Sequence, residues 1–393
     1  MLANKLKFIT PSYTLGIASK VKALRESGEK IINLSVGEPD FYTPETAKDW
    51  AKTALDGNKT KYDAVSGLSE LKKAIIEKFK AQNDLCYGES EIVVSSGAKH
   101  SITNALIAIL NPGDEVMIPK PYWVSYPEMV KLTGGVPVFV DTKKDSNYKV
   151  TSADLEKSLT AKSRILFLTN PSNPSGAVYR REELMDIGNW CVKNGVLILA
   201  DEIYERITFD RPFVSIASLS DEIKEMTITV NGMSKSAAMT GWRIGYTAST
   251  EEIAKAMSTI QGHLVSHPAT VSQWAAYGAM AFCQAETDKM VETYKQRRDA
   301  AVKILKDSED IFLVKPEGAF YLFIDLSAYK SFFPEGESFS VAFCEKLLSE
   351  KKIAVVPGKA FGMDDFIRIA YACDTEELAA GLEGIKAFLS ELK

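Results

Sequence analysis

Seven short apolar runs, separated by segments of helical length, place the strongest constraint on how this chain of 393 residues can fold. Strands that are apolar throughout are buried on both faces, which is typical of a mostly parallel sheet with helices on either side. The intervening segments 98–110, 181–194 and 251–261 repeat apolar residues every three or four positions, as amphipathic helices do. We therefore predict an α/β fold with a seven-stranded, mostly parallel sheet. Its strands are expected at residues 91–96, 115–119, 136–140, 164–169, 195–200, 226–230 and 243–248.

The pattern changes after about residue 285. A charged helical stretch at 288–307 is expected to connect two bodies, and strand–helix–strand order follows it to the C-terminus. This order suits a smaller α+β domain. The first 40-odd residues do not fit the large sheet, so we expect them to return to the small domain. We predict a large domain over 45–287 and a discontinuous small domain over 1–44 and 288–393.

Charge and composition exclude several classes of protein. The chain has 47 basic and 52 acidic residues, a net charge of −5 and no basic block, so nucleic acid is not an expected partner. No apolar run approaches the roughly 18 residues of a membrane span, and the N-terminus lacks a signal-peptide pattern. We expect a cytoplasmic protein that does not bind membranes. The scattered cysteines form no CxxC pair, which predicts reduced thiols; they are Cys86, Cys191, Cys283, Cys344 and Cys373.

Polar residues gather directly after four of the predicted strands, where ligands bind in open α/β sheets. SSGAKH follows the first run, NPSNPSG the fourth, DEIYE the fifth and NGMSKS the sixth. Three of these segments contain a residue with a plain structural explanation. Gly97 suits a turn, Asp201 can cap a helix that it starts, and a lone lysine such as Lys235 is usually exposed.

Taken together, these residues suit different parts of one ligand. Small residues at Gly97 let backbone amides approach an anion at the positive end of a helix. Lys235 lies among small residues, where a carbonyl can reach its amine, and Arg243 can hold a phosphate through two hydrogen bonds. Asp201 is a carboxylate that could face a cationic ring nitrogen. This set matches the chemistry of pyridoxal 5′-phosphate.

Seven ordered motifs resemble those of the class I pyridoxal-phosphate-dependent aminotransferases, most closely the bacterial aspartate (aspartate/prephenate) subgroup. The resemblance runs from about residue 8 to the C-terminus. It implies the fold type I architecture and a homodimer with shared active sites. It also implies ping-pong transfer of the amino group of L-aspartate to 2-oxoglutarate, which forms oxaloacetate and L-glutamate. The motifs are GEPDFYTP, KYDAVSGLSELKKAI, PYWVSYPEM, NPSNPSG, ADEIYE, SKSAAMTGWRIGY and FIRIAYA.

The resemblance implies a cofactor role for each residue that matches a family motif. Lys235 would form the Schiff base and later move the α-proton, Asp201 would pair with the pyridine nitrogen, and Trp123 would stack on the ring. Asn173 and Tyr204 would hydrogen-bond the ring hydroxyl, with Tyr204 counted as catalytic beside Lys235 and Asp201. The phosphate would be surrounded by Ser96, Gly97, Ala98 and Arg243, together with Tyr62 from the neighbouring subunit.

The resemblance also implies how an amino-acid substrate would be held. Arg368 would grip the α-carboxylate, Gly37 would close over it, and Asn173 and Trp123 would assist. Lys99 matches the lysine that this subgroup uses for an acidic side chain. A cation is unfavourable in the first turn of a helix, and a nearby phosphate and dicarboxylate would remove that conflict. Further candidates for substrate contact are Ser12 and Thr14.

Three positions depart from the family pattern. Gly232 stands where many members carry a serine that contacts phosphate. His263 and His267 replace Ser and Thr in a segment that borders the dimer's active sites. Their spacing does not predict a metal site, because no acidic residue lies between them and Pro268 follows at once.

Several alternatives stay open from the sequence. The same chemistry could act on aromatic amino acids, prephenate, alanine or kynurenine, and a β-lyase or a cyclopropane-forming synthase would use the same cofactor. A non-catalytic protein that binds pyridoxal phosphate or amino acids is a remote alternative, since such regulators usually carry a DNA-binding domain. A nicotinamide-dependent dehydrogenase is disfavoured, because the GxGxxG fingerprint is missing.

Overall fold

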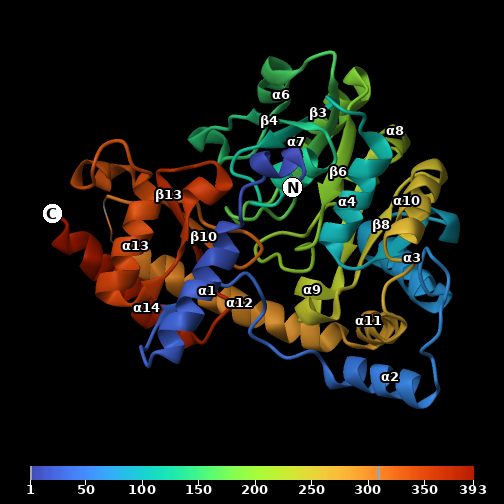
Figure 1. Cartoon of the computed structure of the whole chain (residues 1–393), viewed down its shortest axis with the longest axis horizontal. Helices are drawn as coiled ribbons and strands as arrows, with labels where there is room; N and C mark the ends of the chain where they lie inside the picture. The colour runs from blue at the N-terminus through green and yellow to red at the C-terminus, as the bar shows by residue number, and fades with distance from the viewer. Residues whose placement is uncertain (1, 307, 309) are drawn as a thin grey trace.

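A seven-stranded sheet forms the centre of the larger part of the molecule (Figure 1). The structure is a computed structural model that describes residues 2–306, 308 and 310–393. The strand order is β2-β8-β7-β6-β5-β3-β4. Only β8 runs antiparallel to its neighbours, so the predicted mostly parallel sheet is confirmed and each predicted apolar run contains a strand. The strands are β2 (Ile92–Ser95), β3 (Glu115–Pro119), β4 (Val136–Val140), β5 (Ser163–Thr169), β6 (Leu197–Asp201), β7 (Thr227–Gly232) and β8 (Gly245–Ala248).

Helices cover both faces of this sheet, because alternate strand residues enter different cores. Val116, Ile165 and Leu199 pack with α4, α5 and α10 on one face. Met117 and Ile198 pack with α6, α7 and α8 on the other face, and α2, α3 and α11 cover the end formed by β2 and β8. These helices are α2 (Glu45–Asp56), α3 (Ser69–Asn83), α4 (Ala98–Ile109), α5 (Tyr126–Leu132), α6 (Ser152–Ser158), α7 (Arg181–Asn194), α8 (Asp221–Glu225), α10 (Glu251–Leu264) and α11 (Thr270–Phe282).

The C-terminal part of the chain builds a second, antiparallel sheet of order β12-β13-β10-β9. The helices α13 and α14 pack on this part through a core that includes Phe343, Leu382 and Phe388. This arrangement is the expected smaller α+β unit. Its elements are β9 (Phe312–Leu313), β10 (Tyr321–Asp325), α13 (Phe339–Lys351), β11 (Ile353–Ala354), β12 (Val356–Pro357), β13 (Phe366–Ala370) and α14 (Thr375–Glu391).

The N-terminal segment touches both parts. Strand β1 (Ile32–Asn33) pairs in parallel with β11, and helix α1 (Tyr13–Glu26) packs Val21 against Leu348 of α13. Residues 4–10 lie instead beside α5, where the Thr10 amide donates a hydrogen bond to Glu128 at 2.9 Å. The division into domains at 45–287, with 1–44 and 288–393 as the other, stays a prediction.

Helix α12 (Gln284–Leu305) connects the two parts, running from beside α11 to beside α14 (Figure 1). Its Arg297 makes two hydrogen bonds to Asp40, of 2.9 and 2.8 Å. The neighbouring Arg298 is almost fully buried and pairs with Asp210 while donating to the Pro316 carbonyl. The helix therefore fixes loops from both parts of the chain against each other.

The remaining elements are short. Helix α9 (Met233–Ser236) follows β7 directly, and in the part of the chain that the structure describes no helix has the length and apolar character needed to cross a bilayer. All five cysteines are free thiols. The short 3₁₀ helices are η1 (Asn4–Phe8), η2 (Glu89–Glu91), η3 (Lys144–Ser146), η4 (Ile216–Ser218), η5 (Thr240–Trp242), η6 (Ser327–Phe332) and η7 (Gly358–Phe361).

The close contact between α2 and α11 yields a test of the packing. A methyl group on Gly278 would lie 2.4 Å from the Trp50 ring, which stacks with the rings of Trp274 and Phe282 at 5.9 and 5.8 Å. Overpacking costs about 1–3 kcal/mol, which exceeds the gain of about 1 kcal/mol in helix propensity. We expect Gly278→Ala to lower the free energy of unfolding by about 1 kcal/mol, measured from urea unfolding midpoints.

Gly16→Ala is the matched control, because it is also a helical glycine but has nothing within 4 Å of the added carbon. It should raise the free energy of unfolding by up to about 1 kcal/mol. Equal stability of the two variants would contradict this account of the α2–α11 contact.

Candidate active site

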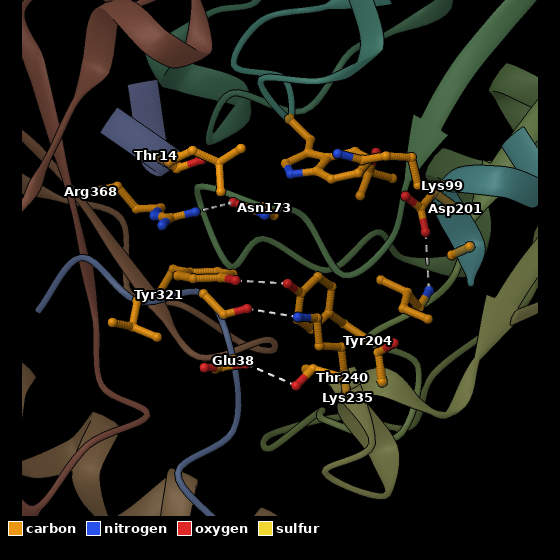
Figure 2. Close-up of a pocket in the computed structure, with 18 of the residues that line it drawn as sticks. Thr14, Glu38, Lys99, Asn173, Asp201, Tyr204, Lys235, Thr240, Tyr321 and Arg368 are labelled. Carbon is orange, nitrogen blue, oxygen red and sulfur yellow. Dashed lines mark hydrogen bonds between the residues drawn. The ribbon is translucent and has the colours of Figure 1, made fainter. Parts of the chain in front are cut away.

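A cavity of about 390 Å³ lies beyond the carboxyl ends of β5, β6 and β7, between the large sheet and the second part of the chain (Figure 2). This volume is within the range of small-molecule sites. Residues from distant segments meet there, as the strand-end argument predicted. The predicted residues that line it are Thr14, Gly37, Ala98, Lys99, Trp123, Asn173, Asp201, Tyr204, Lys235, Arg243 and Arg368.

Lys235 projects from α9 into this cavity, and its Nζ donates a hydrogen bond of 2.6 Å to the Gly37 carbonyl (Figure 2). Burial lowers the pKa of this amine to about 8; Arg368 and Arg243 act in the same direction, whereas Glu38 and Asp201 oppose them. An amine with this pKa is far more often unprotonated near neutral pH than an ordinary lysine, so it is able to attack a carbonyl.

Asp201 ends β6 and is 5% exposed. Its carboxylate accepts a hydrogen bond of 2.6 Å from the Tyr126 hydroxyl and a longer one from the Ile203 amide. Burial raises its pKa, and these hydrogen bonds act against that rise. The helix expected to start at Asp201 is wrong: turns follow the strand there. The carboxylate is thus a buried acceptor at the cavity, not a helix cap.

Tyr126 is the main residue at this end that sequence reasoning missed. Its ring stacks on Phe167 at 4.2 Å, and its hydroxyl also lies 2.7 Å from the Thr169 hydroxyl. Tyr126 stands three residues after Trp123 in the PYWVSYPEM motif, one turn along at the start of α5. That spacing was the available signal for a second cavity-facing aromatic residue.

Arg368, on β13, is 2% exposed. It donates to the Asn173 side-chain oxygen at 3.1 Å and to the Ser35 carbonyl at 2.9 Å. Its guanidinium carbon lies 4.4 Å from the centre of the Tyr321 ring and 5.0 Å from that of Phe361. Only two of its five N–H groups are occupied by these bonds, and its buried Nε has no partner among the described residues. The guanidinium is therefore held rigidly with donors to spare.

Tyr204 and Tyr321 face each other beside this arginine, with their hydroxyls 2.7 Å apart (Figure 2). Burial raises the pKa of Tyr204 well above its ordinary value, so it carries its proton. Sequence reasoning identified Tyr204 and missed Tyr321. The antiparallel register places it: Phe323 of β10 pairs with Arg368 of β13, so Tyr321 lies on the same face two positions away, and no local pattern in the sequence shows this pairing.

Two glycines allow the start of α4 and Arg243 to come together. A side chain on Gly97, whose φ is +90°, would lie 2.5 Å from the Arg243 guanidinium, and one on Gly245 would lie 2.3 Å from the Ala98 nitrogen. The amides of Ser96 and Gly97 donate to His100 and to the Ser95 carbonyl, at 3.2 and 2.7 Å. Ala98 and Arg243 line the cavity, whereas Ser96 and Gly97 stand behind it.

Lys99 reaches over the face of Trp123, with its Nζ 5.0 Å from the ring centre. Burial lowers its pKa, and the neighbouring Arg243 lowers it further. On the opposite side, Thr14 of α1 lines the cavity, whereas Ser12 is not among the lining residues and its hydroxyl lies 2.9 Å from the Thr14 hydroxyl. Lys99 and Arg368 thus place two cations on the same cavity.

Three further residues complete the neighbourhood. Glu38, Thr240 and Ser234 line the cavity and were not predicted; the Thr240 hydroxyl donates to Glu38 at 2.8 Å. Gly232 has a steric reason to differ from serine, because a side chain there would lie 2.8 Å from the Ile244 carbonyl oxygen and 2.9 Å from the Gly245 Cα.

Tyr62 lies outside the cavity of its own chain and is 89% exposed. Its ring edge meets His267, which accepts a hydrogen bond from the Asp63 amide and lies 2.7 Å from the Pro268 carbonyl. His263 is separate and lines a different surface hollow. Within residues 2–306, 308 and 310–393, no group of three or more His, Cys, Asp or Glu residues is arranged to hold a metal ion.

Comparison with known proteins identifies the family. Residues 29–385 match the family model described as aminotransferase class I and II. An aspartate aminotransferase of Bacillus sp. (strain YM-2) is 44% identical over 392 residues, covering 99% of each chain. A probable aspartate/prephenate aminotransferase of Aquifex aeolicus is 43% identical, covering 100% of this chain and 99% of its own.

Solved structures agree in fold. The aspartate aminotransferase of Rhizobium meliloti has a TM-score of 0.94 at 40% identity, covering 98% of each chain. That of Thermus thermophilus, solved with maleate, has a TM-score of 0.92 at 36% identity, covering 98% of this chain and 99% of its own. The motif resemblance and the fold type I expectation are both confirmed, and the chain belongs to the class I and II aminotransferases.

Proposed function

We propose that this protein transfers the amino group of L-aspartate to 2-oxoglutarate in a ping-pong reaction, which forms oxaloacetate and L-glutamate. The observation that carries the proposal is the presence of two cations, Arg368 and Lys99, on the cavity that also contains the Lys235 amine. Both substrates are dicarboxylates, and each carboxylate can meet one cation. The names of the Bacillus and Rhizobium proteins, and the dicarboxylate maleate in the Thermus structure, support the same specificity.

Class I and II aminotransferases depend on pyridoxal 5′-phosphate, and the cavity residues suit that group. The buried Asp201 carboxylate would be stabilised by a cationic ring nitrogen, which would offset its desolvation. Arg243, Ala98 and Ser234 supply a cation, an amide and a hydroxyl for the phosphate. When bound, the cofactor acts as an electron sink for the bond that breaks at the substrate α-carbon.

The chain's own groups have complementary tasks in this proposal. Lys235 would hold the cofactor through its carbonyl carbon and, once released, would move the proton from the substrate α-carbon to that cofactor carbon; its low pKa suits both tasks. Asp201 would keep the ring nitrogen charged, while Tyr204 and Asn173 would donate to the ring hydroxyl. Trp123 would cover the ring face and limit access of water.

The fixed orientation of the Arg368 guanidinium would orient the substrate. Asn173 and Ser35 fix the plane of Arg368, so its remaining N–H groups can meet the α-carboxylate as a fork. Lys99 then reads the second carboxylate. Prephenate also carries two carboxylates and appears in the name of the Aquifex relative. It is therefore a second candidate for the 2-oxo acid that accepts the amino group taken from aspartate.

We also propose that the protein is a cytoplasmic homodimer with shared active sites. Tyr62 supports this assembly, because its exposed hydroxyl has no role in its own chain's cavity and is free to reach a partner's phosphate site. The free thiols suit a reducing compartment.

The half-reaction tests the specificity directly. Addition of L-aspartate, with no 2-oxo acid present, should bleach the visible absorption of the cofactor-loaded protein, and 2-oxoglutarate should restore it.

Substitution of Lys99 tests how the second carboxylate is recognised, because it removes a hydrogen bond to a charged group that is worth about 1.5–3 kcal/mol. The Lys99→Ala variant should therefore lose about ten-fold or more in kcat/KM for L-aspartate.

Phenylalanine is the internal control for Lys99→Ala, because it has no second carboxylate and its kcat/KM should change by less than about three-fold. Equal losses for aspartate and phenylalanine would show that Lys99 does not read the acidic side chain. Bleaching by aromatic amino acids alone would replace the proposed substrate.

Titration of Lys235 tests its role independently of turnover. In the cofactor-free protein, modification of Lys235 by an amine-specific reagent should rise with pH to a midpoint at about pH 8, read by peptide mass spectrometry. Below this pH the amine is protonated and unreactive. Glu38→Gln should move the midpoint lower, because the Glu38 carboxylate favours the ammonium form.

Glu292→Gln removes an exposed carboxylate from α12 and should leave the Lys235 midpoint unchanged. A Lys235 midpoint above pH 10 would mean that the amine is not desolvated as described.

Mixed dimers test the shared site. Tyr62→Leu should weaken cofactor binding by about ten-fold, as expected for loss of one hydrogen bond to a phosphate. A dimer with one Tyr62→Leu chain and one Lys235→Ala chain contains one site with both native residues if sites are shared. That hybrid should recover about half of the wild-type activity at limiting cofactor, whereas either parent variant should not. Absence of recovery, or a monomer in sedimentation, would exclude the shared site.

A further inference from the structure

We propose that Tyr321 is a positioning residue that couples carboxylate recognition at Arg368 to the orientation of the Tyr204 hydroxyl. The inference rests on the proposed aminotransferase site and adds a link between its substrate end and its cofactor end. Tyr321 is the first residue of β10 and is 1% exposed, so its contacts are fixed by the surrounding packing.

The ring of Tyr321 supports the substrate end. Its antiparallel register with β13 puts Tyr321 on the same face as Arg368, and the guanidinium carbon lies 4.4 Å from its ring centre. Phe361 covers Arg368 at 5.0 Å, so the cation is held between two aromatic rings. Such contacts stabilise a desolvated cation and restrict its motion.

The hydroxyl of Tyr321 supports the cofactor end. It lies 2.7 Å from the Tyr204 hydroxyl, and the two rings meet edge to face at 5.8 Å (Figure 2). A hydroxyl has one proton to donate and two positions to accept. When Tyr321 donates to Tyr204, the Tyr204 proton is free for an acceptor elsewhere in the cavity. The Tyr321 hydroxyl therefore determines where Tyr204 can donate.

The loop at Gly37 closes the third side of this contact. A side chain on Gly37 would lie 3.0 Å from the Tyr321 hydroxyl and 3.7 Å from the Arg368 guanidinium. The Gly37 carbonyl accepts the Lys235 hydrogen bond. The Tyr321 hydroxyl is thus enclosed by Gly37 and Tyr204, and little freedom remains for it to point elsewhere.

Charge provides the coupling between the two ends. The positive guanidinium near Tyr321 makes this phenol a stronger hydrogen-bond donor toward Tyr204. A carboxylate bound to Arg368 would offset that charge and weaken the donation. Binding of substrate is thereby sensed at Tyr204 through the Tyr321 hydroxyl.

Two substitutions separate the ring from the hydroxyl. Tyr321→Phe keeps the ring over Arg368 and removes the bond to Tyr204, whereas Tyr321→Leu removes both. Tyr371→Phe is the matched control: it deletes a buried tyrosine hydroxyl from the adjoining segment, bonded to the Ala319 carbonyl at 3.1 Å and outside the cavity.

Cofactor-loaded protein should respond as follows. For Tyr321→Phe, kcat with L-aspartate should fall about five-fold and the visible absorption spectrum should shift, while KM and the Kd of maleate stay within two-fold of wild type. For Tyr321→Leu, the Kd of maleate, measured by calorimetry, should also rise about five-fold. Tyr371→Phe should match wild type in all four measurements.

A double-mutant cycle shows whether the hydroxyl acts through Tyr204. In a Tyr204→Phe background, Tyr321→Phe should cause no further fall in kcat and no further spectral shift. Independent, multiplicative effects would overturn the inference, as would a Tyr321→Phe variant indistinguishable from Tyr371→Phe.

The measurements also separate this inference from the proposed function. Failure of the wild-type protein to react with L-aspartate would overturn the proposed substrate alone. The visible absorption spectra are recorded without substrate. They therefore still test the Tyr321–Tyr204 link if the wild-type protein does not react with L-aspartate. Turnover by wild type with an unaltered Tyr321→Phe spectrum and kcat would overturn the link and leave the proposed function standing.

Discussion

One ion pair holds the loop on which the site depends. Arg297 of α12 fixes Asp40 through two hydrogen bonds, and residues 35–38, just before Asp40, line the cavity. In this loop the Ser35 carbonyl accepts from Arg368 and the Gly37 carbonyl accepts from Lys235. Arg368 lies on β13 of the second sheet and Lys235 on helix α9, which follows β7 of the large sheet, so the loop sets the distance between them. An ion pair between a buried arginine and a solvent-exposed aspartate stabilises little by itself, and its value lies in the geometry that it fixes.

The charge of the cavity follows from this geometry and restricts its ligands. Among the lining residues, four cationic side chains face only two carboxylates, Glu38 and Asp201. Burial of unbalanced positive charge is costly unless anions enter. Burial lowers the pKa values of Lys235 and Lys99, which means that their charged forms are destabilised in the cavity. A phosphate together with a dicarboxylate would restore the balance, which is why cofactor and acidic substrate suit the same cavity.

The sequence predicted the sheet and most of the cavity because both depend on local pattern. Apolar runs define strands, and residues directly after parallel strands must share one edge. Tyr126 and Tyr321 escaped because their positions depend on ring stacking and on the β10–β13 register, neither of which is local. The helix expected at Asp201 was wrong for a related reason: Glu202 and Glu205, which follow β6, interact with residues distant in the sequence, namely Ser215, Lys78 and Asn83. The homodimer with shared sites stays a proposal, because it depends on a contact between two chains.

Close packing explains why Gly232 replaces the serine that contacts phosphate in many family members. Gly232 of β7 pairs with Gly245 of β8, and Gly245 in turn touches the first residue of α4. Side chains at either glycine would push these three elements apart. Their contact brings Arg243 beside Gly97 and places Ser234 and Lys235 on the same cavity. A serine at position 232 would add one hydroxyl but disrupt the approach that assembles the anion-binding end, whereas Ser234 already offers a hydroxyl there.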